Sequence, residues 1–157
     1  MHARLTSEVR GNHLTLAGMI DEHADLARLL EHAKDKQLVI DLGGVTFINS
    51  LGIRDWIRMQ QAAQSAGIAI ELRRVAEPVV HQLNIMPAAR GVSMVTSFFA
   101  AYVCDDCDQE HRMLLDVRTH GSDLAKLRAP AMKCPDCQHD MDIANPPEFY
   151  FMFLAGS

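Results

Sequence analysis

Four cysteines form the clearest chemical pattern in the sequence. They make two CxxC pairs, and all four lie after residue 103 of the 157. Two residues between the cysteines let both sulfurs of a pair face one ion, and two pairs complete a tetrahedral four-sulfur site. We therefore expect one structural Zn²⁺ in a zinc ribbon, held by Cys104, Cys107, Cys134 and Cys137.

The segment that carries these cysteines needs a metal for physical reasons. A segment of about 60 residues rarely sustains a hydrophobic core without a staple such as a structural ion. Disulfides or redox-active pairs are the alternative, which a cytoplasmic setting disfavours as structural bonds. A catalytic zinc needs an open coordination position, which four thiolates do not leave. His111 and His139 lie close to the pairs and could replace or support a ligand, but with four cysteines available we expect them to lie outside the ligand set.

A strand followed by a helix is predicted in the middle of the chain. Residues 38–42 are an apolar run that is typical of a buried strand, and we expect Gly43-Gly44 to end it. From Ser50, apolar residues recur at helical spacing as far as Gly67, so we expect a helix over 50–66. Either Asn49 or Ser50 would cap it, at an end where an attached anion is stabilised.

The rest of the first hundred residues alternates between strand and helix patterns. The order predicts an α/β fold with an open mixed sheet and helices on one face. We expect Asp21 to cap the first of these helices. The expected strands cover residues 5–9, 13–17, 37–42, 68–72 and 92–96, and the expected helices cover 26–33, 50–66 and 77–83.

Asp41 and the segment Ile48-Asn49-Ser50-Leu51-Gly52-Ile53 resemble the STAS domain of anti-sigma-factor antagonists. Members of that family carry an Asp at the end of a strand, then an apolar-Asp-Ser-x-Gly-apolar loop that leads into a helix. Gly18-Met19-Ile20-Asp21 matches a second family pattern, and the resemblance covers residues 1–97. It implies a STAS-like domain over 1–97, and the cysteine pairs predict a zinc-ribbon extension over 98–157.

The resemblance also implies a function for the loop. In antagonists of this type a partner kinase, which is also the anti-sigma factor, phosphorylates the Ser that Ser50 matches. Asn49, Asp41 and Gly52 would belong to the same partner-binding site. The sequence departs from the pattern at Asn49, where the family has Asp, and at Leu51, where a second small residue is frequent. Alternatively, Ser50 is only a cap and the chain is a constitutive STAS subunit of a larger assembly, such as a lipid transporter.

Composition and charge limit the classes of function that this chain can have. The net charge of −5 argues against a nucleic-acid partner, because such affinity comes from neutralising phosphates. Neither an apolar signal core nor a stretch long enough to span a bilayer is present, so we expect a cytoplasmic protein. No residue set has catalytic spacing, which predicts a non-enzymatic interaction module.

We expect the apolar tail Phe149–Leu154 to be buried. The alternative is self-association through this tail or through the ribbon.

Overall fold

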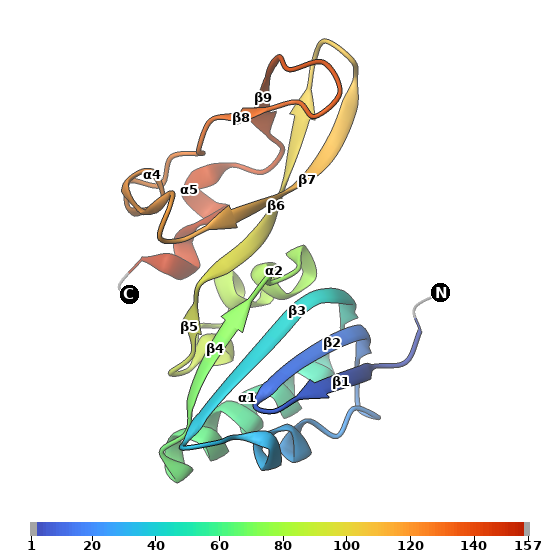
Figure 1. Cartoon of the computed structure of the whole chain (residues 1–157), viewed down its shortest axis with the longest axis vertical. Coiled ribbons are helices and arrows are strands. Elements are labelled where there is room, and N and C mark those ends of the chain that lie inside the picture. Colours follow the sequence, from blue (N-terminus) through green and yellow to red (C-terminus); the bar gives the residue numbers. More distant parts are fainter. Residues whose placement is uncertain (1–2, 156–157) are drawn as a thin grey trace.

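The computed structural model describes residues 3–155 and contains two β-sheets (Figure 1). Sheet A has five strands in chain order, and sheet B has four in the order β7-β6-β9-β8. In sheet A the first two strands are antiparallel and all other neighbours are parallel, so the sheet is mixed. The predicted α/β class is therefore confirmed. The strands of sheet A are β1 (Thr6–Arg10), β2 (His13–Ile20), β3 (Gln37–Ile48), β4 (Ala69–Arg73) and β5 (Met94–Val95).

Helical segments connect the parallel strands of sheet A. They are the 3₁₀ helix η1 (Leu26–His32) and the α-helices α1 (Ser50–Ala66), α2 (Glu77–Ile85) and α3 (Pro87–Arg90). Burial alternates along β3, where Leu38, Ile40 and Leu42 are buried and the residues between them are half-exposed. One face of the sheet thus carries the core, and the other faces solvent.

The prediction that Gly43-Gly44 ends the central strand is wrong. β3 continues through both glycines to Ile48, and its register with β2 shifts where Gly44 pairs with Ala17. A Cβ at Gly44 would lie 2.7 Å from the Ala17 Cβ, so glycine allows the two backbones to approach here. In a strand, glycine often marks such a bulge rather than an end.

The first crossover is a 3₁₀ helix rather than the α-helix that the sequence predicts. Its buried residues, Leu26 and Leu29, are three apart, which matches the three-residue turn of a 3₁₀ helix. Asp21 does not cap it, because its carboxylate accepts the backbone N–H of His23 at 2.9 Å in a local turn. Asp35 and Lys36, both with positive φ, then return the chain to β3.

Sheet B is antiparallel and carries the C-terminal part of the chain. Its strands are β6 (Ser97–Cys104), β7 (Gln109–Asp116), β8 (Met132–Lys133) and β9 (Asp140–Ile143), with α4 (Gly121–Ala125) between β7 and β8. The tail ends in α5 (Pro147–Tyr150) and the 3₁₀ helix η2 (Met152–Leu154).

β6 and the C-terminal tail join the two sheets. β6 rises from sheet A into sheet B (Figure 1), and Phe98 near its start bridges to Val75 after β4. The Phe98 ring lies 5.8 Å from that of Phe151 and 5.1 Å from that of Phe153. Tyr150 is buried with both, so half of the apolar tail belongs to a core that both parts of the chain share.

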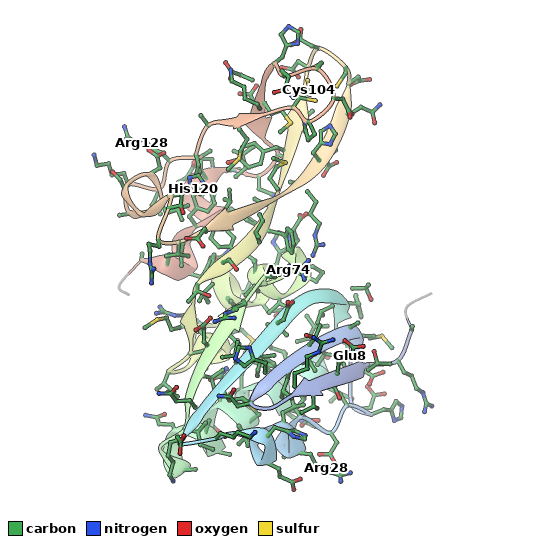
Figure 2. All side chains as sticks on the ribbon, in the orientation of Figure 1. Glu8, Arg28, Arg74, Cys104, His120 and Arg128 are labelled. Atoms are coloured by element: carbon green, nitrogen blue, oxygen red, sulfur yellow. The ribbon has the colours of Figure 1, made fainter. Side chains whose placement is uncertain are left out.

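A second contact joins the sheets on the exposed side. Arg112 of β7 donates to the Gly43 carbonyl of β3 at 2.7 Å, and its guanidinium lies 3.4 Å from the centre of the Phe99 ring. Burial, and then the neighbouring Arg74 guanidinium, lower the pKa of Arg112. Figure 2 labels Arg74 at this junction. The contact anchors sheet B to the strand that leads to Ser50.

Replacing Asn84 tests the packing of the tail. The Asn84 side chain donates to the Tyr150 carbonyl at 2.9 Å and accepts the Phe153 N–H at 2.7 Å. Asn84→Ala leaves both backbone groups unpaired, so we expect urea denaturation to show a loss of about 2 kcal/mol. The matched control is Asn12→Ala, which removes a single exposed bond to Gln37. Equal small losses from both variants would contradict this role of Asn84.

Candidate metal centre and partner-binding surface

Two β-hairpins bring the four cysteines together. The first hairpin joins β6 to β7 and closes at Cys104, which pairs with Gln109, so the first CxxC forms its turn. The second joins β8 to β9 and holds the second CxxC between Lys133 and Asp140. β6 also pairs with β9, which sets the hairpins side by side with both turns at the same end of sheet B. Figure 2 shows sulfur atoms gathered beside Cys104 at that end.

The two turns share one backbone feature. The residue directly after the second cysteine of each pair has positive φ: Asp108 at 54° and Gln138 at 65°. This left-handed conformation reverses the chain within one residue, at a cost of about 1–2 kcal/mol for a residue other than glycine. The paired strands hold that conformation in both turns, and so direct both cysteines of a pair to the same side.

The four sulfurs are placed so that they can hold one metal ion. Cys104 Sγ lies 3.4 Å from Cys137 Sγ, and Cys107 Sγ lies 3.5 Å from Cys134 Sγ. A tetrahedral zinc site with Zn–S bonds of about 2.3 Å requires sulfurs about 3.8 Å apart, so a small expansion admits the ion. All four are free thiols in this structure, and Cys104 and Cys134 are buried. The donor set suits zinc.

Burial and mutual hydrogen bonds separate the pKa values of the thiols in the cluster. Burial raises the pKa of the Cys134 thiol, but the backbone N–H groups of Cys137 and Asp136 and neighbouring thiols outweigh it and lower that pKa to about 6. The hydrogen bond to Cys104, with burial, raises the pKa of Cys107 to about 12. Packed thiols cannot all lose their protons unless a cation takes the protons' place.

Two histidines flank the cluster, as the sequence suggests. His111 Nε2 lies 3.5 Å from Cys134 Sγ and 3.6 Å from an oxygen of Asp136. His139 Nδ1 lies 3.6 Å from Asp106 in the opposite turn. Asp136 was not among the predicted site residues, although its place between Cys134 and Cys137 is a local signal.

The predicted partner-binding residues Asn49, Ser50 and Gly52 come together at the start of α1. Asn49 is the N-cap, since its side-chain oxygen accepts the Gly52 N–H at 2.7 Å. Ser50 is the first helical residue and is exposed, and within residues 3–155 its hydroxyl makes no hydrogen bond. The alternative in which Ser50 serves as the cap is therefore wrong.

Gly52 and Glu22 complete the surroundings of Ser50. A Cβ at Gly52 would meet the Ile20 carbonyl far inside van der Waals contact, so the helix start can lie against β2 only with glycine here. The Asn49 amide also donates to the Glu22 carboxylate at 3.2 Å, an interaction that the sequence analysis missed. Backbone and Asn49 hydrogen bonds lower the pKa of Glu22. No local signal pointed to Glu22, because it is far from Asn49 in sequence.

Asp41 does not lie with the other three residues. It sits in the middle of β3, where its carboxylate accepts the Gly43 N–H at 2.8 Å and pairs with Arg74 at 3.2 Å. Asn49 follows the far end of the same strand. Asp41 thus belongs to the junction between the sheets, close to the Arg112 contact.

The fold and the cysteine cluster define an α/β protein with a candidate metal centre. No protein-family model matches the chain, and no curated protein matches it. The STAS assignment therefore stays a prediction from the motifs. No helix within residues 3–155 is long and apolar enough to cross a membrane.

Metal analysis tests the four-cysteine site. We expect one zinc ion per chain in protein purified without chelator, because four thiols converge on one point. Chelation should lower the free energy of unfolding and first remove hydrogen-exchange protection from sheet B. Cys104→Ser should lower metal affinity at least about tenfold, whereas His139→Ala should retain the ion. Protein that contains no metal after zinc-supplemented expression would contradict the site.

Substitution of Gly52 tests the close approach of α1 to β2. Alanine favours a helix by about 1 kcal/mol, yet we expect Gly52→Ala to destabilise the protein by about 2 kcal/mol, because its Cβ meets backbone. The control is Gly121→Ala at the start of α4, where a Cβ meets nothing within 4 Å. Chemical denaturation of both variants provides the comparison, and equal stabilities would exclude the clash.

Proposed function

We propose that this protein is a non-enzymatic, cytoplasmic signalling module of the STAS type. It binds a protein partner through the start of α1, and phosphorylation of Ser50 switches that binding. A zinc ion held by the four cysteines would stabilise the C-terminal part. The observation that carries the proposal is the exposed Ser50 hydroxyl on a helix whose capping bond Asn49 already makes.

The surface around Ser50 combines apolar docking area with a place for a phosphate. Leu51, which follows Ser50 in the sequence, is 40% exposed. An exposed apolar side chain of this kind is suited to packing against a partner. Arg54 is one helical turn beyond Ser50 with half of its side chain exposed, so it shares a face with Ser50.

A phosphate on Ser50 would change this surface electrostatically. It adds a charge of about −1.5 to −2. The helix N-terminus and Arg54 would stabilise the phosphate within the protein. A partner packed over Leu51 would then have to bury that charge, and would dissociate.

One observation favours the constitutive alternative, a STAS subunit of a larger assembly such as a lipid transporter. The Glu22 carboxylate is held against Asn49, next to Ser50, and a negative charge there opposes a second one. Asn49 in place of the family's Asp fits this arrangement, since an amide can bond Glu22 whereas a carboxylate would be repelled. In this case Ser50 would be an unmodified contact residue.

Affinity capture with matched baits tests the switch. Wild type and Ser50→Ala should recover the same partner from source cytosol, and Ser50→Glu should weaken that recovery at least about tenfold, because a charge enters an apolar contact. Ser65→Glu is the control, as it adds the same charge to an exposed position near the other end of α1. Mass spectrometry identifies the captured proteins.

The captured proteins distinguish the phospho-switch from the constitutive role. A kinase-like or sigma-pathway protein lost only with Ser50→Glu supports the phospho-switch. The same assembly subunits recovered with all four baits would overturn the switch and support the constitutive role.

A further inference from the structure

A second set of metal-binding side chains overlaps the four-cysteine cluster. The ligand atoms of Cys107, His111, Cys134 and Asp136 all lie within 4.8 Å of one another. Cys107 and Cys134 belong to both sets, whereas Cys104 and Cys137 belong only to the first. The ribbon thus offers two groups of four ligands that share one edge, the 3.5 Å separation of the Cys107 and Cys134 sulfurs.

Two further distances in the second set, both from His111, match the edges of a tetrahedral zinc site. From usual metal–ligand bond lengths, sulfur and nitrogen ligands lie about 3.6 Å apart and nitrogen and oxygen ligands about 3.4 Å apart. His111 Nε2 lies 3.5 Å from Cys134 Sγ and 3.6 Å from Asp136 Oδ2. Thiolate, imidazole and carboxylate are all zinc ligands, so the chemistry fits as well as the spacing.

The strands hold this second set in place. His111 lies on β7 opposite Tyr102 of β6, a buried residue whose hydroxyl donates to the Pro130 carbonyl at 2.8 Å. The His111 side chain is 19% exposed, while Asp136 in the second turn is 67% exposed. The strand therefore positions His111, whereas the exposed side chain of Asp136 is free to move towards an ion.

His139 is a natural comparison within the same ribbon. It is adjacent to the second turn and pairs with Asp106 of the first turn at 3.6 Å, but it belongs to neither ligand set. Its side chain is 62% exposed. Nearness to the cysteines alone does not make a histidine a ligand here.

We propose that Cys107, Cys134, His111 and Asp136 form a reserve zinc site, which keeps the ion in the ribbon when Cys104 and Cys137 are not available as ligands. With all four cysteines bound, His111 contacts Cys134 from outside the coordination sphere. When Cys104 and Cys137 disengage, the ion moves across the shared Cys107–Cys134 edge and gains one nitrogen and one oxygen ligand. The centre can then lose two thiolates without losing its metal.

Two double variants of the full chain test the proposal, because each removes two thiolates. Cys104→Ala/Cys137→Ala leaves the reserve set complete, whereas Cys107→Ala/Cys134→Ala breaks both sets. Alanine cannot itself ligate. Cobalt(II) titration of the metal-free proteins, followed by X-ray absorption, counts the bound ions and the sulfur neighbours.

We expect Cys104→Ala/Cys137→Ala to bind one cobalt ion with two sulfur neighbours and two nitrogen or oxygen neighbours. Cys107→Ala/Cys134→Ala should bind at least about a hundredfold more weakly, since no complete set remains. Adding His111→Ala to the first variant should remove the binding, and adding His139→Ala should not. In the presence of all four cysteines, His111→Ala should keep a four-sulfur shell.

Equal cobalt binding by the two double variants would overturn the proposal. So would equal effects of His111→Ala and His139→Ala in the first variant. If Cys104→Ala/Cys137→Ala takes up no cobalt, whether or not circular dichroism shows a folded chain, the reserve site does not exist.

Discussion

The strand β6 is the constraint on which the rest of the structure depends. At its start Phe98 bridges to Val75 and packs against the aromatic tail, and at its end Cys104 enters the cysteine cluster. Seven of the eight residues of β6 are buried, and near its end the strand pairs with β7 on one side and with β9 on the other. A single strand therefore ties the position of the metal centre to the core of sheet A. The domain boundary that the sequence predicts between residues 97 and 98 lies at the start of this strand.

Hydrophobic packing and the cysteine cluster lie at opposite ends of sheet B. The tail aromatics cover the end of sheet B nearest sheet A, where Tyr150, Phe151 and Phe153 are buried. At the opposite end, β6 and β7 meet the short strands β8 and β9, and both turns contain a residue in the left-handed conformation. Four thiols lie at that end, and an ion bound by them would take the place of a larger hydrophobic core.

The start of α1 shows how a loop can leave one side chain free. Asn49 satisfies the end of the helix on one side and bonds Glu22 on the other, while Gly52 lets the first turn lie against the Ile20 carbonyl. Asn49 and Gly52 fix the conformation of this loop, so the side chain of Ser50 between them has no structural role. Side chains without a structural role at a well-ordered helix end are suited to regulation or docking.

The sequence by itself determined what short-range physics controls. Helical periodicity with Asn49 and Gly67 at its ends predicted α1 at its observed bounds, and the CxxC spacing predicted the cysteine cluster, because both signals act within a few residues. Tertiary structure decided the rest. It carried β3 past Gly43-Gly44, where Gly44 fits against Ala17, and it paired Asp41 with Arg74 rather than with the Ser50 loop. Strand register and backbone approach depend on partners far away in the chain, which no local pattern encodes.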